Sequence, residues 1–191
     1  MRWGFRLGSC ALLALAVGGC GGGGERQDVN EPSGTFDVDV VRDSFPLTQH
    51  VSQQSRLRIE VRNAGDQTIP NVAVTVKGFT TRDTAPGLAD PNRALWIVDV
   101  GPHGGDTAYV GTWALGRLGP GHSRTFEWRV TPTKAGRFDV SYEVAAGLNG
   151  KAKARARNGA RPGGSFTVRV SGKPADAHVD PNTGGVVREG D

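Results

Sequence analysis

The sequence predicts an all-β protein that folds as a two-sheet sandwich of about seven strands. Apolar and polar residues alternate with a period of two in seven short stretches, which places the apolar side chains on one side of a sheet. Glycine and proline interrupt the chain between these stretches, and no stretch has the i, i+3, i+4, i+7 apolar spacing of an amphipathic helix. A closed barrel of the same strands is the structural alternative.

The alternating stretches follow one another at the spacing of strands and turns. Most have one apolar and one polar face, as expected for a strand that covers a core. The stretch 95–100 differs because both of its faces carry apolar residues. Trp128 is the tryptophan that we expect in the core. The predicted strands are 36–41, 56–62, 72–77, 95–100, 125–130, 138–144 and 165–171, with turns that include 63–66, 119–121 and 132–136.

The N-terminal segment has the three parts of an export signal. Arg2 and Arg6 are its only charges, the apolar run 7–17 is shorter than the roughly 20 residues that span a bilayer, and two glycines precede Cys20. Because a cysteine follows these small residues directly, residues 1–19 resemble a bacterial lipoprotein signal. This implies an extracytoplasmic protein, anchored to the bacterial membrane through a lipid on Cys20. An ordinary secretory signal with a chance cysteine is the alternative.

Removal of this signal changes the charge and the cysteine count. The full chain has 23 basic and 19 acidic residues, and the loss of two arginines leaves a net charge of +2, which gives no support to nucleic-acid binding. Cys10 leaves with the signal, so no disulfide is expected. Residues 20–33 are glycine-rich and then polar, which predicts a tether, and residues 172–191 predict a flexible C-terminal tail.

Three motifs resemble those of the bacterial CARDB-type immunoglobulin-like domains. Residues 57–76 (LRIEVRNAGDQTIPNVAVTV) resemble the first strand, Asn-x-Gly turn and following strand of that family. Residues 118–128 (LGPGHSRTFEW) and 132–140 (PTKAGRFDV) resemble its later turns and strands, with Phe138 in the aromatic position. The resemblance implies an immunoglobulin-like sandwich over residues 34–171. It also implies a cell-surface adhesion or scaffold module without catalytic residues.

The chain departs from this family by a long insertion at about residues 79–121. Long loops inside a compact domain are often binding elements, and Trp and Tyr are favoured anchors in recognition surfaces. Trp96, Tyr109 and Trp113 are therefore the candidate binding residues. The alternative is that these aromatic side chains cover one end of the sandwich and belong to its core.

A second unusual segment is the basic run of Lys151, Lys153, Arg155 and Arg157, which alternates with alanines. As a strand it would place four cations on one face. One interpretation is a solvated edge strand, where lysine and arginine oppose edge-to-edge aggregation. The other is contact with an anionic surface, either phospholipid headgroups or an acidic wall polymer.

The residues give little support to catalysis, and we expect no catalytic residues, no metal and no cofactor. The four histidines are scattered, no serine stands in a nucleophile elbow, and the aspartates of the insertion do not have the spacing of a calcium loop. Three hypotheses follow. The first is a non-catalytic, lipid-anchored module that binds an envelope protein or a wall polymer. The others are a small-ligand-binding accessory lipoprotein and an envelope enzyme.

Overall fold

The computed structural model describes residues 28, 30–84, 86–87, 91–173, 175 and 177–188. Its regular elements are all strands. In chain order they are β1 (Gly34–Ser44), β2 (Thr48–His50), β3 (Ser55–Asn63), β4 (Ala73–Lys77), β5 (Arg82–Thr84), β6 (Asn92–Ala94), β7 (Trp96–Val100), β8 (Asp106–Tyr109), β9 (Thr112–Ala114), β10 (Ser123–Pro132), β11 (Gly136–Ala145), β12 (Ala152–Arg155), β13 (Gly163–Ser171), β14 (Ala177–Val179) and β15 (Val186–Arg188).

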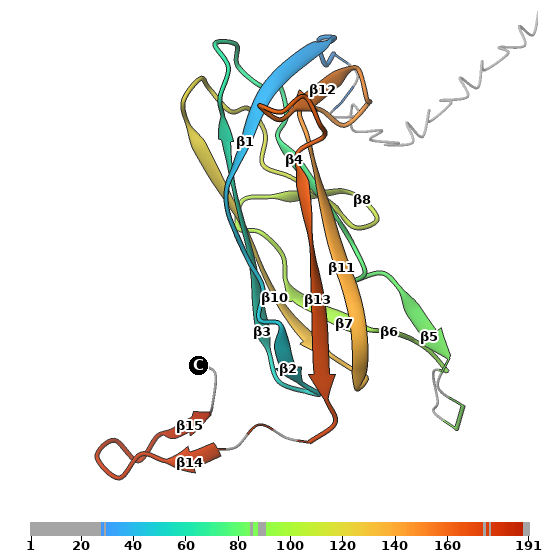
Figure 1. Ribbon diagram of the computed structural model, residues 1–191, viewed down its shortest axis with the longest axis vertical. Coiled ribbons are helices and arrows are strands. Elements are labelled where there is room, and N and C mark those ends of the chain that lie inside the picture. The colour runs from blue at the N-terminus through green and yellow to red at the C-terminus, as the bar shows by residue number, and fades with distance from the viewer. Residues whose placement is uncertain are drawn as a thin grey trace, which may run out of the picture.

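Two sheets pack face to face and form a sandwich (Figure 1). One sheet has five strands in the order β12-β1-β3-β10-β7, and the other has six in the order β2-β13-β11-β4-β9-β8. The two sheets remain separate, which distinguishes the fold from a closed barrel. The predicted all-β sandwich is confirmed, and each of the seven predicted strands is present. The additional strands are short and lie either in the connections or, for β14 and β15, after β13.

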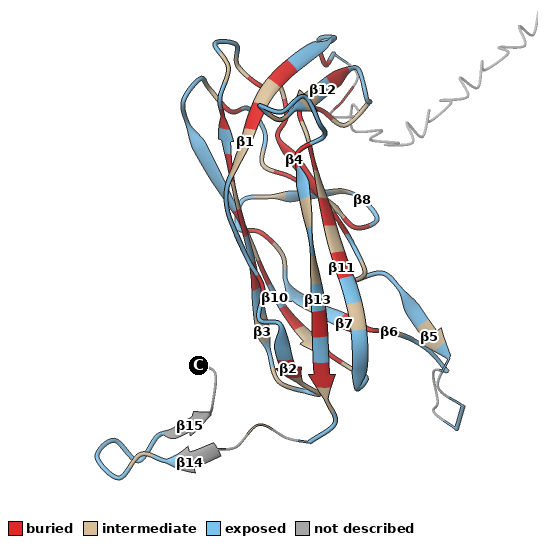
Figure 2. Ribbon diagram, in the orientation of Figure 1, coloured by how far each residue is buried: buried red, intermediate tan, exposed pale blue. Residues whose placement is uncertain are grey.

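The core lies between the sheets and is built by the predicted alternation. Along β3, Leu57, Ile59 and Val61 are fully buried, while Arg58 between them is exposed and Glu60 is half-buried. Buried and exposed residues also alternate along β13 (Figure 2). Each fully buried large aliphatic side chain contributes about 1.5–3 kcal/mol relative to an exposed one, so the alternation stabilises both the strand and the sandwich. Trp128 is fully buried, as predicted.

Both faces of residues 95–100 carry apolar side chains, and strand β7 shows which of the two faces points inward. Trp96 is 1% exposed, whereas Ile97 is 50% exposed. The antiparallel pairing with β10 places Trp96 opposite the buried Pro132, and the register shifts between Arg129 and Val130. This bulge leaves Val100 47% exposed as well. The ladder with β10 therefore selects the inner face, which the alternation of the stretch could not specify.

The insertion at residues 79–121 contributes strands to both sheets. It places β7 at the edge of the five-stranded sheet and places β8 and β9 at the edge of the six-stranded sheet. Strands β5 and β6 form a separate hairpin. Gly111 turns β8 into β9 with a φ of 74°, and a Cβ at this position would lie 3.0 Å from the Val76 carbonyl oxygen. Only glycine fits this turn without strain.

Two pairs of strands are parallel and join distant parts of the chain. Strand β12 pairs with the start of β1, and β2 pairs with the end of β13. Within the predicted tail, β14 and β15 form an antiparallel hairpin. The flexibility of residues 172–191 remains a prediction.

Candidate functional site

Two of the three candidate binding aromatics belong to the core. Trp96 is 1% exposed and Trp113 is 8% exposed, so neither presents a recognition surface. The Trp96 ring packs edge-on against Phe138, with centroids 5.4 Å apart, and the Trp113 ring packs edge-on against Trp128, also at 5.4 Å. The structure thus agrees with the core interpretation for both tryptophans.

The two core tryptophans of the five-stranded sheet differ in the bonding of their indole N–H groups. Trp96 Nε1 donates to Gln49 Oε1 at 3.0 Å, and Gln49 Nε2 in turn donates to the Pro46 carbonyl at 2.9 Å. Gln49 is itself only 2% exposed. Trp128 Nε1 is buried and has no hydrogen-bond partner in the described part of the chain. This contrast has a measurable energetic consequence because an unpaired buried N–H costs about 1–3 kcal/mol.

Tyr109, the third candidate, lies at the surface. It ends β8 and is 47% exposed, and the next residue, Val110, is 86% exposed. These two residues form the hairpin tip between β8 and β9, which projects from the sandwich (Figure 1). The Tyr109 hydroxyl donates to Asp28 Oδ2 at 3.3 Å. The hairpin tip therefore contacts the chain segment that leads from the N-terminus into the domain.

That segment is fixed to the domain before β1 begins. Glu31 is 9% exposed, and its carboxylate accepts hydrogen bonds from the backbone N–H groups of Leu148 (2.7 and 2.9 Å) and Asn149 (3.1 Å). Asn149 Nδ2 donates to the Asp28 carbonyl at 2.7 Å. We call Asp28 and Glu31 the tether root. The sequence placed both residues in the tether, whereas the structure packs them against the loop after β11.

The basic run forms the edge strand that the sequence predicted as one interpretation. Strand β12 ends the five-stranded sheet, with Ala152 buried and Lys153 exposed. Parallel pairing with β1 places Arg155 beside Asp37, and their side chains form an ion pair at 2.8 Å. Arg157 lies 3.6 Å from Asp39. Two of the four cations are thus paired with carboxylates.

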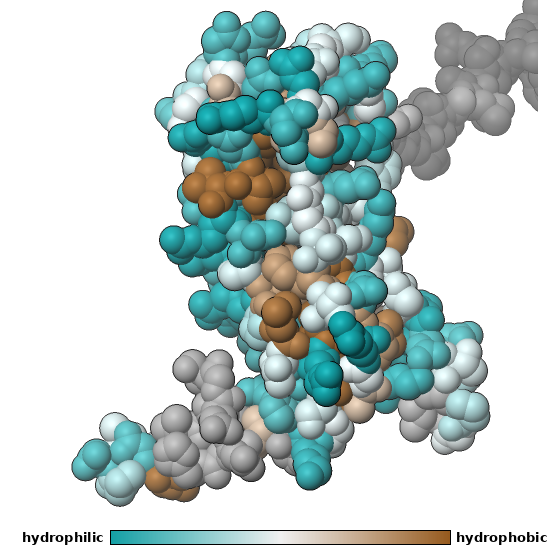
Figure 3. Space-filling view, viewed as in Figure 1, coloured by the Kyte–Doolittle hydropathy of each residue, from teal (hydrophilic) through white to brown (hydrophobic). Residues whose placement is uncertain are grey.

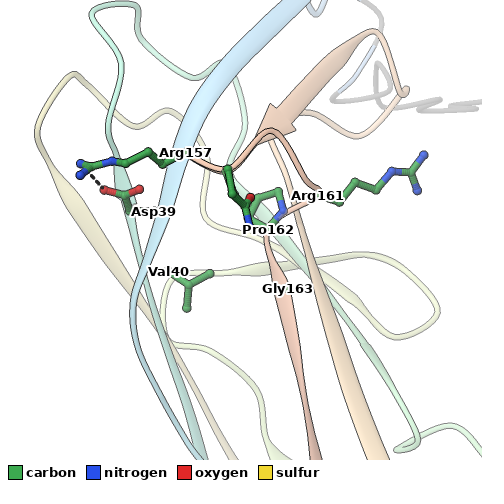
Figure 4. Close-up of a pocket in the computed structure, with 8 residues that line it drawn as sticks. Asp39, Val40, Arg157, Arg161, Pro162 and Gly163 are labelled. Atoms are coloured by element: carbon green, nitrogen blue, oxygen red, sulfur yellow. Dashed lines mark ion pairs between the residues drawn. The ribbon is translucent and has the colours of Figure 1, made fainter.

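A depression of about 370 Å³ lies beside the segment between β12 and β13 (Figure 4). Arg157 points across it toward Asp39, while Arg161 points to the opposite side. Its lining thus combines the paired Arg157 and Asp39 with the additional cation Arg161. Neither Trp96 nor Trp113 borders it.

The described residues contain no cluster of three or more histidine, cysteine, aspartate or glutamate side chains that could hold a metal. His50 Nδ1 lies 2.8 Å from the Lys173 carbonyl oxygen and takes part in a local backbone contact. The exposed Asp83 has a lowered pKa because Lys134 donates a hydrogen bond to it and carries the opposite charge. Such a surface pair is an ordinary structural feature.

The pKa of Tyr142 is clearly shifted by its surroundings in the folded protein. Its hydroxyl donates to Asp43 Oδ2 at 2.6 Å. Burial, followed by this hydrogen bond and the charge of Asp43, raises the pKa of Tyr142 above its ordinary value of 10.0. Because Asp43 belongs to β1 and Tyr142 to β11, the bond links the two sheets. We assign it a structural role.

The proposed lipidation site, Cys20, lies outside the described residues, as does the whole predicted signal. The part of the chain that the structure describes has no helix long and apolar enough to cross a bilayer. Lipid anchoring therefore remains an inference from the sequence.

Three features of the structure were not predicted as functional from the sequence. Ile97 and Val100 form an exposed apolar pair on β7, and the signal for it was the apolar character of both faces of residues 95–100. The exposed Val110 is the second such feature, and the signal for it was its position directly before a turn glycine, in Tyr109-Val110-Gly111. Glu31 had no signal, because its partners lie more than 100 positions later in the chain.

Comparison with known proteins gives likenesses of fold alone. No protein-family model and no curated protein matches the chain. The structure is similar to the CARDB domain of a Pyrococcus furiosus protein, determined in complex with di-metal ions, at 17% identity and a TM-score of 0.42, covering 73% of this chain and 93% of that one. It is also similar to native alpha-2-macroglobulin from Escherichia coli, spanning domain MG7 to the C-terminus, at 15% identity and a TM-score of 0.45, covering 78% and 21%. A human PapD-like domain is similar at 11% identity and a TM-score of 0.42, covering 88% and 99%.

Proposed function

We propose that this protein is a non-catalytic, lipid-anchored module of the bacterial envelope that binds another envelope protein. The observation that carries the binding proposal is edge strand β7. It ends the five-stranded sheet, and Ile97 and Val100 on it are 50% and 47% exposed. An edge strand with apolar side chains is a template for an extended segment of another chain, which would pair with its backbone.

The edge is held in a defined shape, which favours recognition over nonspecific association. Asp99, between the two apolar residues, accepts hydrogen bonds from Thr131 Oγ1 at 2.7 Å and Gln54 Nε2 at 3.1 Å. These bonds fix the bulged end of β7 to the neighbouring strand β10 and to the residue that precedes β3. A preformed edge loses less conformational entropy on binding than a mobile one.

The anchor is proposed from the sequence of residues 1–20. A lipid on Cys20 would hold the sandwich at the membrane through a short connection. The small-ligand hypothesis required a pocket lined by Trp96 and Trp113. Both side chains are instead packed in the core, so we favour a surface function.

The binding proposal is tested by capture from envelope extracts with the mature chain, residues 20–191. We expect wild type to retain one specific protein and the variant Ile97→Lys/Val100→Lys to lose it. The matched control is Val41→Lys/Leu47→Lys, because these residues are 52% and 55% exposed and the variant has the same change of charge elsewhere on the sandwich.

Equal capture by all three chains would place the site away from β7 and refute this assignment. Capture of a wall polymer, released by wall-degrading enzymes, would replace the protein partner with a polymer. The anchor has a separate test, the mass of the N-terminal peptide of the native protein, in which an unmodified Cys20 would refute lipidation.

A further inference from the structure

The tether root lies between a basic and an apolar part of the surface. The Asp28 carbonyl accepts a hydrogen bond from Asn149, two residues before Lys151, and its carboxylate accepts one from Tyr109. The backbone N–H of Gly34 then bonds to the Lys151 carbonyl at 3.1 Å. The chain that comes from Cys20 therefore enters the domain between the hairpin tip and the start of the basic strand.

Three cations near this entry are exposed and have no ion-pair partner among the described residues. They are Lys151 and Lys153, at the start of the basic strand, and Arg161, in the segment that follows it. Arg155 and Arg157 differ because Asp37 and Asp39 pair with them. In Figure 4, Arg161 points away from the paired Arg157 and toward the side on which the hairpin tip projects in Figure 1. The unpaired cations remain available to an external anion.

The hairpin tip adds an apolar element to this region. Val110 is 86% exposed and Tyr109 is 47% exposed. In the space-filling view a small apolar spot marks the tip, while the end of the sandwich around β12 is mostly hydrophilic (Figure 3). An aromatic hydroxyl, a short aliphatic side chain and nearby cations are the combination that favours the interface of a membrane.

We propose that this surface rests on an anionic bilayer, with Lys151, Lys153 and Arg161 facing phospholipid headgroups and Val110 entering the interface. The inference rests on the proposed lipid anchor. Asp28 follows Cys20 by eight residues, and a fully extended chain of that length spans about 30 Å. The anchor thus keeps the tether root close to the membrane. The contact would orient the sandwich and leave β7 open to a partner.

The test uses the full mature chain, residues 20–191, with Cys20→Ser so that no lipid takes part. Binding to phosphatidylglycerol vesicles is measured by co-sedimentation at low salt, with phosphatidylcholine vesicles as the neutral reference. Each cation near an anionic surface contributes about 1 kcal/mol, about fivefold in partition. The variant Lys151→Gln/Lys153→Gln/Arg161→Gln should therefore bind about 100-fold more weakly. Val110→Ser should bind about tenfold more weakly.

The matched control is Arg137→Gln/Arg169→Gln/Lys173→Gln. It removes three exposed cations at the other end of β13, so its net charge equals that of the test variant. We expect this control to bind almost as wild type does. Equal losses in the two triple variants would mean that only net charge matters, and this would overturn the proposal. Binding to an anionic wall polymer in place of vesicles would overturn it too. Because no lipid is attached, failure here is independent of failure of the anchor.

Discussion

The two buried tryptophans of the five-stranded sheet allow a direct test of what a hydrogen bond to a buried indole N–H contributes to stability. Trp96 and Trp128 are 1% and 0% exposed, and replacement of either by phenylalanine removes the same atoms. Only Trp96 donates a hydrogen bond, to Gln49 Oε1. Trp96→Phe therefore leaves a buried acceptor without its donor, at a cost of about 1–3 kcal/mol. Trp128→Phe removes a buried N–H that has no partner among the described residues, which offsets part of the lost packing.

Since the packing loss is common to both variants, Trp96→Phe should lower the free energy of unfolding by about 2–6 kcal/mol more than Trp128→Phe does. Urea unfolding followed by circular dichroism measures the difference, and equal m-values would confirm that the same transition is compared. In a domain of this size the difference corresponds to about 10 °C in Tm. Equal costs, or a larger cost for Trp128→Phe, would show that the Trp128 N–H has a partner in solution and would refute the reasoning.

Two further predictions concern bonds that join distant segments. Tyr142→Phe should cost about 1.5–3 kcal/mol, because its hydroxyl bonds to the Asp43 carboxylate. Folding raises the pKa of Tyr142 above 10.0, so its contribution is complete below pH 10 and falls as the pH rises above that value. Urea midpoints between pH 8 and 11 should thus decline more steeply for wild type than for Tyr142→Phe, and parallel profiles would contradict this. Glu31→Gln should speed amide hydrogen exchange at Leu148 and Asn149 with a Tm change of only a few degrees, because the tether root opens locally. Unchanged exchange would show that the carboxylate does not hold this loop.

The strands could be predicted because alternation is a local property. Leu57, Ile59 and Val61 alternate with charged residues, so only one register buries the apolar residues, whatever the neighbouring strand is. The same logic identified Trp128 as a core residue and gave an edge strand as one of two interpretations of the basic run. It failed to choose a face for residues 95–100, because both faces are apolar and pairing with β10 made the choice.

The candidate site was less predictable because it depends on which distant segments meet. The sequence of an insertion does not show whether an aromatic residue in it binds a partner or packs in the core. Trp96 and Trp113 fill the core because β7 and β9 join opposite sheets, whereas Tyr109 stays exposed at a turn. The charge of the basic run was likewise overestimated, since the parallel pairing of β12 with β1 supplies carboxylates to Arg155 and Arg157.

The sequence by itself determined the all-β class and the positions of the main strands, and it predicts an export signal that ends before Cys20. These follow from local periodicity and from the order of charged, apolar and small residues. Only the tertiary structure decided that Glu31 is fixed to the loop at Leu148, that Lys151 and Lys153 remain unpaired among the described residues, and that Ile97 lies at an open edge. Each depends on contacts between segments far apart in the chain, which no local pattern encodes.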